Sequence, residues 1–138
     1  MSVAQPELPL YRLYVLRLSY ALVGVGQGLK TWPAILHHTN PWDFWHGVGA
    51  SFFGALTLLA LLGIRYPVRM MPLLMFEFAW KLIWVLAAYL PPYLARSVDP
   101  VLADNFISIF LGVVIVPLVL PWGYVWKNYV LAPSDRWR

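Results

Sequence analysis

Residues 70–90 read MMPLLMFEFAWKLIWVLAAYL, and the only charged residues among them are Glu77 and Lys81. A helix needs about 20 mostly apolar residues to cross the hydrocarbon core of a bilayer, and this segment has that length and character. Charged side chains at such a depth are costly and concentrate at functional positions. The segment therefore predicts a membrane-spanning helix that carries a candidate functional site.

The composition of the whole chain also favours a membrane protein. Of its 138 residues, 61% are hydrophobic and 12% are charged, whereas a soluble domain has roughly 25% charged residues. We therefore expect an integral membrane protein with a single transmembrane domain, residues 1–138. The sequence contains no cysteine, which excludes disulfides, thiolate metal sites and thiol nucleophiles.

Three further segments have similar length and apolar character. The four predicted spans cover residues of about 10–29, 44–64, 70–90 and 106–126. Backbone groups in lipid must find their hydrogen bonds within the segment, which requires helices. The short polar connection at residues 65–69 makes the second and third spans antiparallel neighbours. The predicted fold is all-α, an integral membrane four-helix bundle.

Prolines and capping residues indicate where these helices begin and end. Residues 30–33, KTWP, are expected to end the first span, and the two prolines at residues 91–92 to stop the third. Asp43 is a natural N-cap for the second span, and Asp104 or Asn105 for the fourth.

Lysines and arginines are distributed unevenly between the two sides of this arrangement. Seven lie on one side, namely Arg12, Arg17, Arg65, Arg69, Lys127, Arg136 and Arg138, and two on the other, Lys30 and Arg96. The positive-inside rule then places the N- and C-termini in the cytoplasm, and we expect a multi-pass protein of the bacterial inner membrane. Because the basic residues are scattered between apolar runs, we expect membrane lipids as partners and no nucleic acid.

Arg17 is expected to reach a depth similar to that of Glu77. Glu77 lies on the order of 12 Å from the inner edge of its span, and Lys81 follows it by one turn on the same face. Together the three side chains would carry one surplus positive charge in a low dielectric, which favours an anionic or polar ligand. The candidate ligand site also includes the neighbouring aromatic residues Tyr14, Tyr20, Trp80 and Trp84.

Several interpretations of these charges stay open. In the structural alternative, Glu77 pairs with Lys81 while Arg17 extends to the interface, and the charges only fix helix register. The preferred function is non-enzymatic: binding of a lipid-like or small polar ligand, or a role as an accessory subunit. The alternatives are a quinone-linked redox component and a small transporter, which with four spans requires a homo-oligomer or a larger membrane complex. The sequence identifies no cofactor.

A second polar group occurs in HHTNPWDFWHG, residues 37–47. His37, His38, Asp43 and His46 are weak candidates for metal ligands, since imidazole and carboxylate groups bind zinc or copper. Their spacing matches no standard motif, so we expect no metal site. The segment is more typical of an interfacial loop or a short re-entrant helix whose tryptophans lie at the lipid headgroups.

Three features of the first half carry a family resemblance. They are the arginine-bearing first span (residues 16–18, LRL), its glycine-then-lysine ending (28–30, GLK) and the run GALTLLALLGIR at 54–65. In these features and in its four-helix layout, the chain resembles the DoxX-like family of small membrane proteins. That resemblance implies a redox-associated or accessory role. Members often carry an acidic residue early in the second span, where this chain has GVGAS (47–51); its acid within a span is Glu77.

Overall fold

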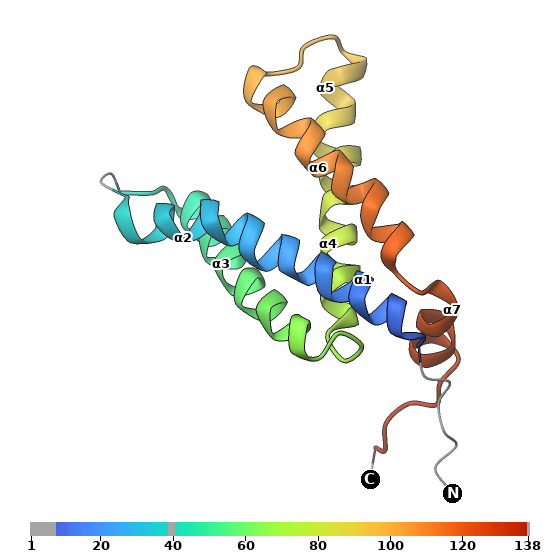
Figure 1. The fold of residues 1–138 in the computed structure, drawn as a ribbon. Helices are drawn as coiled ribbons and strands as arrows, with labels where there is room; N and C mark the ends of the chain where they lie inside the picture. Colours follow the sequence, from blue (N-terminus) through green and yellow to red (C-terminus); the bar gives the residue numbers. More distant parts are fainter. Residues whose placement is uncertain (1–7, 39–40, 138) are drawn as a thin grey trace, which may run out of the picture. The chain divides into compact units, whose positions relative to one another are not determined.

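The computed structural model describes residues 8–38 and 41–137, and over these residues it contains helices and no β-strand. The predicted all-α class is therefore confirmed. The chain divides into two compact units, residues 1–79 and 80–138, and the boundary falls inside helix α4 (Met71–Trp84) (Figure 1). The expectation of one domain stays a prediction.

The first unit consists of one long helix, a second helix that packs along it, and the beginning of α4. The long helix comprises α1 (Leu10–Ala21), the π-helical segment η1 (Leu22–Gln27) and α2 (Gly28–His37). Helix α3 (Phe44–Arg65) contacts all three parts (Figure 1). This pairing forms the core of the first unit.

The long helix continues past residues 30–33, so its predicted end there is wrong. Pro33 lies inside α2, which ends at His37. Contacts with α3 on both sides of the proline explain this. Trp32 Nε1 donates a hydrogen bond of 3.0 Å to Thr57 Oγ1, and a Cβ added at Gly54 would lie 3.0 Å from Ile35 Cδ1. Packing of this kind outweighs the cost of one proline in a helix.

Helix α3 begins and ends near the residues expected from the sequence. Asp43 Oδ1 accepts a hydrogen bond of 2.8 Å from the His46 backbone N–H, which confirms Asp43 as the N-cap. After Arg65 the chain turns sharply, and Met70 N–H donates to Tyr66 C=O at 3.1 Å. The predicted short connection at residues 65–69 is confirmed, and α4 begins at Met71.

The second unit continues from α4 through the π-helical segment η2 (Val85–Tyr89) into α5 (Leu90–Leu94). The prolines at residues 91–92 lie in α5, so the prediction that they stop the third span is wrong. The π-helical turn just before them shifts the hydrogen bonding, and Leu90 N–H donates to Val85 C=O, five residues back. This altered backbone hydrogen bonding accommodates the two prolines, which have no backbone N–H group to donate.

Helix α6 (Pro100–Val119) replaces the predicted span at about 106–126, whose bounds are wrong. Its N-cap is Asp99, which accepts from Val101 N–H at 2.8 Å, and not Asp104 or Asn105. A proline at the first helical position suits this start.

Helix α6 ends at Val119 because the next residue, Leu120, is followed by a proline, Pro121. Leu120 adopts an extended conformation (φ −64°, ψ 127°), as the clash with the following proline ring requires. The chain then forms the short helix α7 (Trp122–Val125) and the π-helical segment η3 (Trp126–Val130).

Three helices in the described part of the chain are long and apolar enough to cross a membrane. They are Phe44–Arg65, Met71–Leu94 and Pro100–Val119. This agrees with the expectation of a membrane protein. The expected span at residues 10–29 lies in the long first helix, which is not among the three, so the four-span bundle stays a prediction.

Candidate functional site

Arg17 lies at the C-terminal end of α3 within the first unit. Its Nε donates a hydrogen bond of 3.1 Å to the Ile64 carbonyl, in the last turn of that helix. The last carbonyls of a helix have no partner in the helix itself and form the negative end of its dipole. Arg17 therefore caps α3, while its guanidinium carbon lies 5.6 Å from the centre of the exposed Tyr14 ring.

Tyr20 is a second residue of α1 that contacts the C-terminal end of α3. The side chain is fully buried, and its hydroxyl donates a hydrogen bond of 2.8 Å to the Pro67 carbonyl. Its ring also occupies the position where Gly63 would carry a Cβ. Arg17 and Tyr20, both expected in a ligand site, thus hold α1 to α3 and to the turn that follows it.

Glu77 is 0% exposed and lies on α4. It is the only charged side chain that is fully buried among residues 8–38 and 41–137. The side chain is thus enclosed by the protein, within a helix that is otherwise almost entirely apolar. A carboxyl group in such surroundings is costly unless other groups interact with its charge.

Lys81, also on α4, lies against Gly112 of α6 within the second unit. A Cβ added at Gly112 would lie 2.5 Å from Lys81 Cδ and 2.6 Å from Nζ. The ammonium nitrogen is also 5.5 Å from the centre of the Trp80 ring, within the range of cation–π attraction. Gly112 was not singled out from the sequence. Its only signal there is a lone glycine in the apolar run LGVVIV, residues 111–116.

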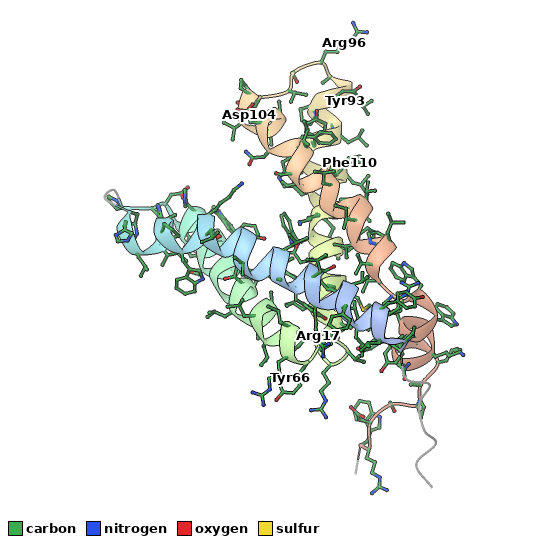
Figure 2. The ribbon with its side chains drawn as sticks, viewed as in Figure 1. Arg17, Tyr66, Tyr93, Arg96, Asp104 and Phe110 are labelled. Carbon is green, nitrogen blue, oxygen red and sulfur yellow. The ribbon has the colours of Figure 1, made fainter. Side chains whose placement is uncertain are left out.

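Trp84 belongs to an aromatic cluster in the second unit. Its ring stacks on Tyr89 at 6.0 Å between centroids, and Tyr89 stacks on Phe106 at 4.0 Å. Tyr93 and Phe110 extend the stack at 5.9 and 5.2 Å (Figure 2). Tyr89, on which Trp84 stacks, therefore joins η2 both to α5 and to α6. The expected clustering of Glu77, Lys81 and Arg17 stays a prediction.

His38, which follows α2, and His46, in the first turn of α3, both stack on Trp42. Trp42 stacks on His38 at 4.1 Å and on His46 at 5.0 Å between ring centroids. His38 Nδ1 lies 2.9 Å from the Ile35 carbonyl, and the Asp43 carboxylate caps α3. No three side chains suited to metal binding come together in the part of the chain that the structure describes.

The comparisons with known proteins leave the site to be interpreted from its own geometry. No protein-family model, curated protein or solved structure matches the chain. The resemblance to the DoxX-like family stays an expectation. The contacts of Arg17, Tyr20 and Lys81 and the burial of Glu77 therefore carry the functional argument.

Proposed function

We propose that this chain is a four-span protein of the bacterial inner membrane that binds a lipid-like or small polar or anionic ligand at the charged residues of α4. The complete burial of Glu77, in a helix long and apolar enough to cross a membrane, carries this proposal. An ionised side chain at the centre of a membrane helix costs roughly 2.5–3.5 kcal/mol. A charged residue in such a place is therefore found mainly where its charge has a function.

Lys81 supplies the cation for such a ligand. Lys81 is a half-buried residue, and Gly112 provides the space in which the lysine side chain lies close to α6. A desolvated ammonium attracts an anionic group more strongly than one in water. Arg17, by contrast, caps α3 through Ile64, which favours the structural role for that residue.

Native mass spectrometry of the full chain in mild detergent tests the ligand. We expect the wild-type protein to retain a small molecule, and Glu77→Gln and Lys81→Gln each to reduce its retention at least about tenfold. Lys81→Gln removes the cation that attracts an anionic group of the ligand, and Glu77→Gln removes a carboxylate that accepts a hydrogen bond from a polar group of the ligand. Glutamine preserves much of the shape and polarity, so Tm is expected to change little. Lys127→Gln, an exposed position outside the three candidate spans, is the control and should retain the molecule.

Two results would contradict the proposal. One is wild-type protein that carries no bound molecule; the other is normal retention in Lys81→Gln together with a sharp fall of Tm in Glu77→Gln. The second result would assign Glu77 to folding alone. The same spectra distinguish the alternatives, because a retained quinone would indicate a redox component, and an oligomeric mass would favour a transporter.

The proposed topology has four spans and cytoplasmic termini. Since the chain has no cysteine, single cysteines can report their side of the membrane through a membrane-impermeant maleimide. We expect Ser97→Cys to react in intact spheroplasts, and Ser2→Cys and Ser134→Cys to react only after lysis, because the positive-inside rule orients the chain. Labelling of Ser2→Cys from outside would show that the first helix does not cross.

A further inference from the structure

The turn between α3 and α4 presents two arginines around one aromatic ring. The guanidinium carbons of Arg65 and Arg69 lie 5.4 and 5.8 Å from the centre of the Tyr66 ring. All three side chains are exposed. Two fork-shaped donors and a ring with a hydroxyl group are thus available to a molecule outside the chain.

The backbone that carries these side chains is fixed by the first unit. Pro67, in the middle of the turn, is buried and accepts the hydrogen bond of the Tyr20 hydroxyl. Arg17 holds the preceding carbonyl of Ile64, and Figure 2 shows Arg17 and Tyr66 at the same end of the helix pair. A fixed backbone lowers the entropy cost of binding at the turn.

Among the described residues of its own unit, 8–38 and 41–79, the turn has no exposed carboxylate nearby. The acidic residues in the described part of this unit are Asp43 and Glu77. Glu77 is fully buried. Asp43 lies at the other end of α3, which has 22 residues and is therefore about 33 Å long. An anion is the natural partner of the turn.

Apolar side chains lie beside the turn on the last helical turns of α3. Leu58, Leu61 and Leu62 are 54%, 44% and 44% exposed. Exposed leucines near the end of a helix that can cross a membrane suit acyl chains. A free phosphate would use the arginines alone, whereas a phospholipid would use both surfaces.

We propose that the turn formed by Arg65, Tyr66 and Arg69 binds the headgroup of an anionic phospholipid, whose acyl chain lies along the exposed leucines of α3. Each guanidinium group can donate two parallel hydrogen bonds to the oxygens of one phosphate, and tyrosine side chains are common at the depth of the lipid headgroups. This site shares no residue with the ligand site at Glu77 and Lys81, so either proposal can fail without the other.

The test compares two double variants that each remove two positive charges. Arg65→Gln/Arg69→Gln changes the turn, while Lys127→Gln/Arg136→Gln changes exposed basic residues of the second unit. The purified chain is titrated with phosphatidylglycerol or phosphatidylcholine of identical acyl chains, and bound lipid is counted by native mass spectrometry. We expect wild-type protein to bind phosphatidylglycerol more tightly than phosphatidylcholine. In the turn variant the ratio of the two affinities should fall about 25-fold, about fivefold for each arginine.

The control double variant should keep the preference within about twofold, since scattered charges contribute little to a defined site. Tyr66→Leu retains both arginines and is expected to lose about threefold through the missing ring contacts. Equal losses in the two double variants would overturn the proposal, because net charge alone would then explain the binding. Wild-type protein without a preference for phosphatidylglycerol would overturn it as well.

Discussion

Gly63→Ala is expected to lower the free energy of unfolding by about 3 kcal/mol, at the upper end of the usual cost of overpacking. The added methyl group would enter the space of the Tyr20 ring, with ring atoms at 2.6 and 2.7 Å. Tyr20 cannot easily move aside, because it is fully buried and its hydroxyl is bonded to the Pro67 carbonyl. Either the helices separate or this hydrogen bond breaks.

Unfolding in detergent with increasing sodium dodecyl sulfate, followed by far-ultraviolet circular dichroism, measures this loss. Gly49→Ala is the matched control, since Gly49 is also on α3 and has open space where a Cβ would be. There we expect no loss, or a gain of about 0.5–1 kcal/mol from the better helix propensity of alanine. Similar results for both variants would show that α1 and α3 are not tightly packed at Gly63.

Gly112→Ala is expected to reduce ligand retention at least about tenfold, a loss of roughly 1.4 kcal/mol in binding, with little change in Tm. The added Cβ would lie 2.5–3.0 Å from Cδ, Cε and Nζ of Lys81. A lysine side chain is flexible, so it can move aside at small cost to folding. Its ammonium group would then no longer be placed for the ligand.

Native mass spectrometry and a thermal melt of the same preparation separate these two effects. Gly123→Ala is the control in the same unit, because a Cβ there meets no atom within 4 Å. In a Lys81→Gln background, Gly112→Ala should have no further effect on retention, since both changes act through one side chain. Full retention in Gly112→Ala would show that the ligand does not depend on the position of Lys81.

Local sequence signals predicted some helix ends and missed others for identifiable reasons. Asp43 was identified as a cap because it stands alone before an apolar run, and the structure confirms it. At the start of α6, Asp99, Asp104 and Asn105 are all chemically suitable caps. The choice of Asp99 depends on where the helix begins, which the apolar pattern fixes only to within several residues.

Prolines were the least reliable signals. Pro33 and the prolines at residues 91–92 lie inside helices, although proline disfavours helix interiors. In α2, contacts with α3 on both sides of Pro33 keep the helix intact. In α5, a π-helical turn absorbs the missing hydrogen bonds. Neither the packing around Pro33 nor the altered hydrogen bonding before residues 91–92 can be identified from a short stretch of sequence.

Composition and hydropathy were sufficient to predict the helical class, three of the four expected helices long and apolar enough to cross a membrane, and two ionisable residues inside one of them. These properties depend on the order of residues within a single segment. The contacts of Arg17 with Ile64 and of Tyr20 with Pro67 join residues 47 positions apart. Such pairs, like Lys81 with Gly112, depend on how each helix is rotated toward its neighbour. Side-chain packing sets that rotation, and hydropathy does not encode it.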